Sequence, residues 1–205
     1  MNAPQGTSAW LHERTGFVTG SRFRDVLNFR KDGKPGADRQ KYLMEVVCER
    51  MTGEPTEHFV TKAMQWGIDH EAEARAAFCA ATGLGVTATG FLRHATLKAG
   101  CSPDGIIDME AGLEIKCNTT PVFVDILLNG MGEEYMAQVQ GGMWITGYSH
   151  WFFVAYDPRM PEGLRLHVQK IERDEKYIAN LAEQVKAFSN EADEMIAKLM
   201  EKKHG

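Results

Sequence analysis

The feature that most limits how this chain can fold is a pair of strand-like segments close together in the sequence. CSPDGIID occupies residues 101–108 and GLEIKC occupies residues 112–117, with a tight turn at 109–112 between them. Two such segments joined by a tight turn are typical of an antiparallel hairpin. We therefore predict a β-hairpin over this stretch.

Side chains in the second segment should alternate between the two faces of the strand. Leu113, Ile115 and Cys117 are then expected to point to one face, and Glu114 and Lys116 to the other. The predicted hairpin thus places an acidic and a basic side chain together on one face.

A third charged residue, Asp104, lies on the partner strand, where the hairpin can bring it next to Glu114. Two carboxylates held close together repel each other unless something neutralises them. Mg²⁺ prefers carboxylate oxygens and water, so a metal site is one interpretation. Lys116 would stand about 7 Å along the strand, where it could activate a metal-bound water or stabilise a pentacovalent phosphate. The spacing alone equally fits a surface hairpin with a Glu–Lys ion pair.

A third carboxylate comes from the segment 63–82, AMQWGIDHEAEARAAFCAAT, which is predicted to be a helix ended by Gly83. Ala74 and Phe78 recur on its apolar face. Glu71 lies on or beside that face, where an acid is unexpected. This position makes Glu71 a candidate for the same site.

The other segments indicate an α/β chain with a mixed sheet. In chain order we expect a leader over 1–9, a helical start over 10–27 broken near Gly16 and Gly20, an exposed loop over 30–38, a helix over 39–51, a strand over 85–93, a helix over 133–146, strands over 150–157 and around 164–168, and an amphipathic helix over 174–203.

Composition and charge narrow the class of protein. The chain is 43% hydrophobic and 25% charged, as in ordinary globular proteins. Its four cysteines form no CxxC pair, so we expect reduced thiols, no zinc site and a cytoplasmic location. We expect no signal peptide and no membrane partner.

The net charge of −5 argues against a protein that coats nucleic acid through bulk charge. The basic residues are unevenly placed, however. Residues 21–41 hold seven Lys and Arg against three Asp, which gives this stretch a charge of +4. It is either a solvated loop or a nucleic-acid contact.

Several blocks of the sequence resemble one nuclease family. The blocks are WLHERTGFVTGS, MQWGIDHEAEARAAF, CSPDGIID, GLEIKC, YMAQVQGGMWIT, YDPRMPEGL and IERDEKY. They resemble the PD-(D/E)xK nuclease superfamily and, within it, the bacteriophage lambda exonuclease (alkaline exonuclease, YqaJ-like viral recombinase) family. The resemblance spans nearly the whole chain.

This resemblance implies a single nuclease domain over residues 1–205 with a restriction-endonuclease-like core. The central mixed sheet would be flanked by helices. A DNA-end-binding segment would cover about 10–55, the core about 60–172, and a long C-terminal helix about 174–203.

The resemblance also implies an activity and partners. The enzyme would degrade one strand of double-stranded DNA from 5′ to 3′, with two Mg²⁺ ions for which Mn²⁺ substitutes. It would leave a 3′ overhang for a single-strand annealing protein. A homotrimeric ring, start at a 5′-phosphorylated duplex end, and a phage or prophage origin in a bacterial host are implied as well.

By the same resemblance, Asp104, Glu114, the Ile115 carbonyl and Glu71 would hold metal. Lys116 would orient or activate the attacking water, and Gln138 would approach the same centre. The family's aspartate near the metals is replaced by His94. An arginine that grips phosphate after the family's ELK motif is absent from NTTPVFVD, where Thr119 or Thr120 could substitute.

DNA-binding roles are implied for six further residues. Arg14, Ser21 and Ser102 would hold the 5′-phosphate, Met64 would be a wedge at the last base pair, and Arg30 or Lys31 would enter a groove. Four of the site residues have a plainer interpretation: a surface ion pair for Arg14, a helix cap for Ser21, a core residue for Met64 and an ordinary polar helix residue for Gln138.

Two other functions stay open from the residues alone. One is a structure-specific or restriction-type endonuclease of the same superfamily. The other is a DNA-end-binding or assembly protein whose metal site is structural.

Overall fold

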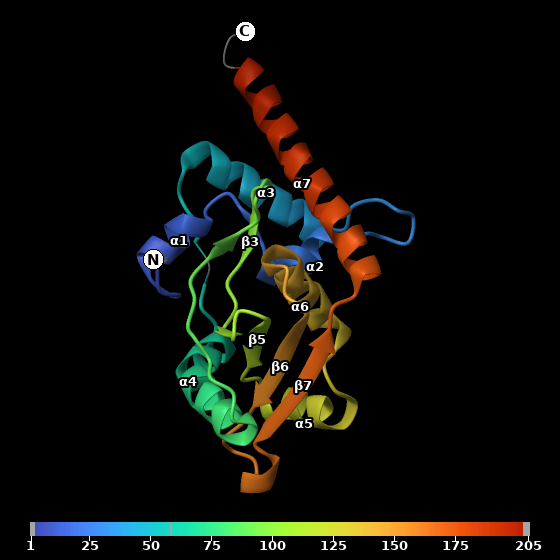
Figure 1. The fold of residues 1–205 in the computed structure, drawn as a ribbon. Helices are drawn as coiled ribbons and strands as arrows, with labels where there is room; N and C mark the ends of the chain where they lie inside the picture. Colours follow the sequence, from blue (N-terminus) through green and yellow to red (C-terminus); the bar gives the residue numbers. More distant parts are fainter. Residues whose placement is uncertain (1–2, 58, 203–205) are drawn as a thin grey trace.

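A four-stranded mixed sheet forms the centre of the computed structural model, which describes residues 3–57 and 59–202 (Figure 1). The strand order is β4-β5-β6-β7. Antiparallel β4–β5 and β6–β7 pairs flank a parallel β5–β6 pair. The strands are β4 (Gly105–Ile107), β5 (Ala111–Lys116), β6 (His150–Tyr156) and β7 (Leu166–Glu172). The expected mixed sheet is therefore confirmed.

One face of this sheet packs against α4 (Lys62–Thr82). Ala74 and Phe78 of α4 form a core cluster with Leu113 and Ile115 of β5 and with Val154 of β6. The predicted alternation along the second hairpin strand is thus confirmed for its apolar side chains.

The opposite face packs against α5 (Thr120–Asn129) and α6 (Glu133–Thr146). Phe123 of α5 and Met143 of α6 share a cluster with Trp151 and Phe153 of β6. Successive β6 residues therefore feed the two opposite clusters, as expected of a strand buried on both faces.

A small second sheet, with the order β1-β3-β2, adjoins the main one. Its strands are β1 (Val18–Thr19), β2 (Leu92–Arg93) and β3 (Ala99–Cys101). The chain reaches β1 through α1 (Ser8–Arg14) and leaves it through η1 (Gly20–Arg22) and α2 (Phe23–Val26). The predicted break near Gly16 is confirmed, since that glycine has a φ of 73°.

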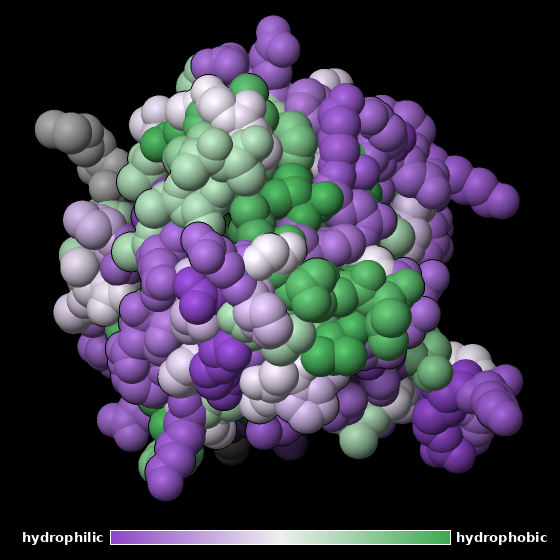
Figure 2. Space-filling view, turned by 90° about the horizontal axis from the view of Figure 1, so that it is seen from below, coloured by the Kyte–Doolittle hydropathy of each residue, from purple (hydrophilic) through white to green (hydrophobic). Residues whose placement is uncertain are grey.

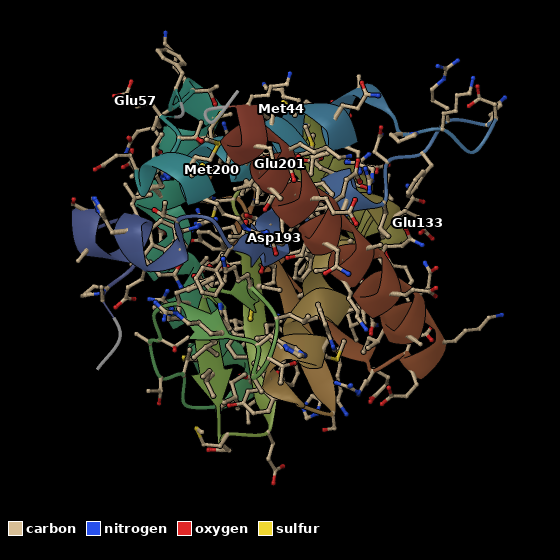
Figure 3. All side chains as sticks on the ribbon, turned by 90° about the horizontal axis from the view of Figure 1, so that it is seen from above. Met44, Glu57, Glu133, Asp193, Met200 and Glu201 are labelled. Atoms are coloured by element: carbon tan, nitrogen blue, oxygen red, sulfur yellow. The ribbon has the colours of Figure 1, made fainter. Side chains whose placement is uncertain are left out.

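The N-terminal and C-terminal helices share a further core cluster. Seen from above, α7 (Glu175–Glu201) lies across α3 (Ala37–Thr52), with Asp193 on α7 (Figure 3). The apolar stripe of α7 is buried at Leu181, Val185 and Phe188. Arg50 Nη1 of α3 lies 2.9 Å from Asp193 Oδ1. The long C-terminal helix is confirmed, although residue 203 of its expected range falls outside the described residues.

Three local predictions are wrong. The expected strand over 101–108 is divided, because Ser102–Asp104 leaves β3 and enters β4, which belongs to the other sheet. Over 85–93 only β2 and a single bridge at Thr87 form. The hairpin turn lies at 108–110, where Asp108 and Met109 have positive φ, and not at 109–112.

Helix α5 is an element that the sequence did not predict. Its ten residues are short for a helical pattern, and Pro121 lies in its first turn. Phe123 and Ile126 are buried, whereas its outer face exposes Val124 and Leu128. Figure 2 shows apolar side chains gathered on the underside of the molecule, where α5 lies.

The longest helix, α7, has 27 residues and a mixed polar and apolar surface. Across the described part of the chain, no helix is both long and apolar enough to cross a membrane.

Candidate active site

A cleft of about 470 Å³ lies between α4, β5, α6 and the N-terminal elements. All predicted site residues line it except Arg30 and Lys31. The residues brought together are Glu71, Asp104, Glu114, Ile115, Lys116, Gln138, Arg14, Ser21, Met64 and Ser102. Residues as far apart in the sequence as Arg14 and Gln138 thus converge on one cavity.

Asp104 is fixed by the hairpin itself. Its backbone N–H donates to the Leu113 carbonyl at 2.9 Å, and its Oδ2 accepts a hydrogen bond from the Ile115 N–H at 2.6 Å. The carboxylate is therefore tied to the strand that carries Glu114.

Glu114, Lys116 and Gln138 form a closed triangle of polar contacts. Glu114 is 3% exposed. Its Oε1 lies 2.6 Å from Lys116 Nζ and accepts from Gln138 Nε2 at 2.6 Å. Lys116 Nζ also donates to Gln138 Oε1 at 3.3 Å, and it lies 5.6 Å from the centroid of the Tyr135 ring. The ammonium group is therefore held in one place from three sides.

Burial shifts the acids of this centre toward their neutral forms. The pKa of Asp104 lies well above its usual range, mainly because of burial and then because of the negative charges of Glu114 and Glu71. Burial also raises the pKa of Glu114 despite the nearby Lys116 ammonium. Burial lowers the pKa of Lys116, but Glu114 and Asp104 outweigh this effect and raise it. The two acids would thus be stabilised as carboxylates by an added cation.

Glu71 completes the acidic wall from α4, but its carboxylate forms an ion pair with Arg75 one turn along the helix. Among residues 3–57 and 59–202, no three His, Cys, Asp or Glu side chains are gathered as a ready metal cage. Mg²⁺ needs only one or two carboxylates, because it keeps several waters. The buried Glu114 and the half-buried Asp104, which line one cleft, fit that requirement.

A second group of polar residues lies in the same cleft. Arg14 Nη2 donates to Ser21 Oγ at 3.4 Å. The Arg14 guanidinium stacks on Trp10, 4.3 Å from the ring centroid, and Trp10 Nε1 donates to Ser102 Oγ at 2.9 Å. Burial lowers the pKa of Arg14 from its usual value. An arginine with two adjacent hydroxyl groups is a suitable phosphate ligand.

Trp10 is a site residue that sequence reasoning missed. It connects the α1 arginine to Ser102, a residue 92 positions away. The signal was its place in the block WLHERTGFVTGS, which also holds Arg14 and Ser21.

Met64 is not a core residue. Its side chain is 50% exposed, and that of Ile68, one turn further along α4, is 62% exposed. Both line the cleft. The plainer interpretation of Met64 is therefore excluded, and an apolar contact with a ligand stays open.

The structure does not place Arg30 and Lys31 at the cleft. They lie in the loop closed by the Phe29–Pro35 bridge, where Arg30 Nη2 is 3.4 Å from Asp32 Oδ2. Both basic residues are exposed, as predicted for a loop at 30–38.

His94 and Thr120 also serve other contacts. His94 Nδ1 accepts from the N–H groups of Thr96 and Leu97 at 3.2 Å, and its ring packs on Trp144. It does not line the cleft. Thr120 Oγ1 donates to Asp157 Oδ2 at 2.7 Å, so it is not available as a substitute for an arginine.

Comparisons with known proteins show which family and which relatives the chain is similar to. The profile of the YqaJ-like viral recombinase domain matches residues 9–149. Protein ExoD of Escherichia coli (strain K12) is 50% identical over 66 residues, which are 32% of this chain and 74% of ExoD.

Two solved structures share the fold. The crystal structure of an alkaline exonuclease, LHK-Exo, from Laribacter hongkongensis has a TM-score of 0.89 and 36% identity, and covers 97% of this chain and 98% of that one. A phage-related exonuclease from Haemophilus somnus 129PT has a TM-score of 0.72 and 18% identity, with coverage of 89% and 96%, and its likeness shows the fold alone.

Proposed function

We propose, since the chain belongs to the family of YqaJ-like viral recombinase domains, that it is a Mg²⁺-dependent exonuclease. It degrades one strand of double-stranded DNA from 5′ to 3′ and leaves a 3′ overhang for recombination by strand annealing. The observation that carries this proposal is a single cleft that joins the buried Glu114, two further acids and a lysine to an arginine and two serine hydroxyl groups.

In this proposal Asp104, Glu114 and the Ile115 carbonyl would hold one metal ion, and Glu71, which is paired with Arg75, would contribute to a second. Mg²⁺, or Mn²⁺ in its place, would supply a more acidic attacking water and neutralise charge on the phosphate. Lys116, fixed by Glu114 and Gln138, orients the water on the face of the hairpin that carries the acids.

The 5′-to-3′ direction of degradation follows from the second group of polar residues in the cleft. Arg14, Ser21 and Ser102 hold the terminal 5′-phosphate, and the distance from them to the acids selects the bond that is cut. Met64, exposed on the cleft wall, separates the last base pair. LHK-Exo, an alkaline exonuclease, was also crystallised with dAMP, a 5′-nucleotide of the kind such a reaction would release.

The proposed assembly is a homotrimer around duplex DNA, acting with a single-strand annealing protein. Arg30 and Lys31, on their exposed loop, then contact a groove of the duplex outside the cleft.

The test compares linear and closed circular duplex DNA in Mg²⁺ and in EDTA. We expect the protein to degrade only the linear duplex, and only with Mg²⁺. Cleavage of the closed circle would instead support an endonuclease, and no degradation of either DNA would reject a nuclease.

Two Asp→Asn variants in the same hairpin make the assignment specific. Asp104→Asn should abolish degradation. Asp108→Asn should leave it intact, because Asp108 is exposed in the turn and Asn tolerates its positive φ. Equal activity of the two variants would contradict the assignment of Asp104 to the active site.

A further inference from the structure

Arg159, in the loop after β6, has one edge fixed by a buried acid. Asp157 is fully buried. Its Oδ1 accepts from Arg159 Nε at 2.7 Å and its Oδ2 from Arg159 Nη2 at 2.8 Å. Such a two-bond pairing sets the orientation of the guanidinium plane as well as its position.

The same guanidinium contacts α4 and the segment after β5, beside the cleft. It stacks on Trp66 of α4, with its central carbon 4.2 Å from the ring centroid. The His70 ring also stacks on Trp66, at 3.7 Å, so the indole is held between two groups. Arg159 Nη2 donates to the Asn118 carbonyl at 3.2 Å. Asn118 lines the cleft two residues beyond Lys116, and Gly67, next to Trp66, lines it as well.

One end of this guanidinium has no assigned contact. An arginine has five N–H donors, and the contacts with Asp157 and Asn118 use Nε and Nη2. Nη1 has no hydrogen-bond or ion-pair partner within residues 3–57 and 59–202. The side chain is 44% exposed.

We propose that Arg159 Nη1 binds a phosphodiester group of the DNA strand that continues past the active centre. This inference rests on the proposed nuclease function. Figure 1 shows α1, which carries the Arg14 end of the cleft, above β5, and the loop between β6 and η2 (Glu162–Leu164) below it. A strand whose 5′ end is held by Arg14 and which crosses the acids therefore leaves toward the loop of Arg159.

The chemistry of the position selects phosphate over a base. Nη1 carries two N–H donors, and the stacking and the pairing with Asp157 hold them at a fixed angle, so that Nη1 can donate to the charged oxygens of a phosphate. The acids at the centre repel the backbone of DNA, and a cation on each side of them holds the strand in place. Since the pairing with Asp157 fixes Arg159 before DNA arrives, little side-chain freedom is lost on binding.

The test measures how duplex binding depends on salt, with Ca²⁺ in place of Mg²⁺ and gel analysis to show that the DNA stays uncut. Removing one phosphate contact should make the slope of log K against log salt less negative by about 0.9. We expect this change, and about tenfold weaker binding, for Arg159→Gln. Arg165→Gln is the matched control, because Arg165 is an exposed arginine after the same loop, with Nε bound to the Met160 carbonyl.

Arg159→Gln leaves Asp157 buried without its partner, so a second variant guards against misfolding. In Asp157→Asn/Arg159→Gln both charges are gone, and the slope should change by the same amount in a protein whose unfolding temperature is close to that of the parent. An unchanged slope in this folded double variant, or an equal change in Arg165→Gln, overturns the assignment.

The same titration separates this inference from the proposed function. If the parent protein neither binds nor degrades linear duplex, the nuclease proposal itself fails. If the parent protein binds and degrades linear duplex, but the Arg159 variants show the same salt dependence of binding as the parent, only the proposed role of Arg159 fails.

Discussion

Lys116→Met tests whether the Lys116 ammonium group stabilises the folded protein by offsetting the negative charge of the acids in the active centre. The substitution keeps an unbranched side chain but leaves Glu114, 3% exposed, without the cation at 2.6 Å from its Oε1. Removing one partner of a buried ion pair typically costs about 3–5 kcal/mol. The Lys116 side chain is 24% exposed and Gln138 still donates to Glu114, so we expect a cost at or just below the lower limit of this range, about 2–3 kcal/mol.

In a chain of 205 residues, each kcal/mol lowers the melting temperature by about 2–4 °C. Lys116→Met should therefore melt roughly 5–10 °C below the parent in EDTA, measured by circular dichroism. Mg²⁺ should raise the melting temperature of the variant more than that of the parent, because the added cation replaces the missing charge. Degradation of linear duplex should fall about 10²–10⁴-fold, as for loss of a group that handles a proton.

Lys170→Met is the matched control. Lys170 and Glu172 are also a Lys–Glu pair two residues apart on a strand, 2.8 Å between Nζ and Oε1, but their side chains are 49% and 70% exposed. An exposed pair contributes little, so this variant should melt like the parent and keep full activity. Equal shifts in melting temperature for the two Lys→Met variants would show that the burial of Glu114 does not make its ion pair with Lys116 more stabilising than an exposed pair.

The remaining predictions concern other parts of the cleft and the assembly. Asp104→Asn should raise the melting temperature in EDTA, because the raised pKa of Asp104 means that its ionised form destabilises the folded state. Asp108→Asn should leave the melting temperature unchanged. A lower melting temperature for Asp104→Asn would contradict this explanation. Arg14→Gln should reduce the preference for 5′-phosphorylated over 5′-hydroxyl ends more than it slows a single cleavage event, and equal parent rates on the two ends would rule out the phosphate role. Sedimentation should give a homotrimer, and a monomer at working concentrations would exclude the proposed ring.

The parts of the site that sequence could predict depend on local geometry. Asp104, Glu114 and Lys116 belong to one hairpin, so strand alternation is enough to place them on one face. Glu71 stood out because an acid broke the apolar face of its helix. In both cases the prediction uses the periodicity of one strand or one helix, which extends over only a few residues.

The parts that sequence missed depend on contacts between distant elements. The Trp10–Ser102 hydrogen bond spans 92 positions, and no periodicity announces it. The stack of Arg159 on Trp66 likewise requires α4 and the loop after β6 to meet. Helix α5 was missed because it is short and most of its residues are apolar, so no polar face marks its period.

His94 illustrates a limit of resemblance. Its place in the sequence suggested a position near the metals, yet its ring accepts backbone hydrogen bonds in a turn and packs on Trp144. The three acids that line the cleft are Glu71, Asp104 and Glu114. The outer contacts of this centre are thus supplied by Gln138 and Tyr135, and not by a fourth acid at position 94.

The most direct test of the account follows one linear duplex with a different label at the 5′ and 3′ end of the same strand, digested with Mg²⁺. We expect that the 5′ label is released first, as a mononucleotide, while the 3′ label stays on long DNA. Early release of the 3′ label, or of both labels together, would contradict a cleft in which Arg14, Ser21 and Ser102 hold the 5′ end beside the acids.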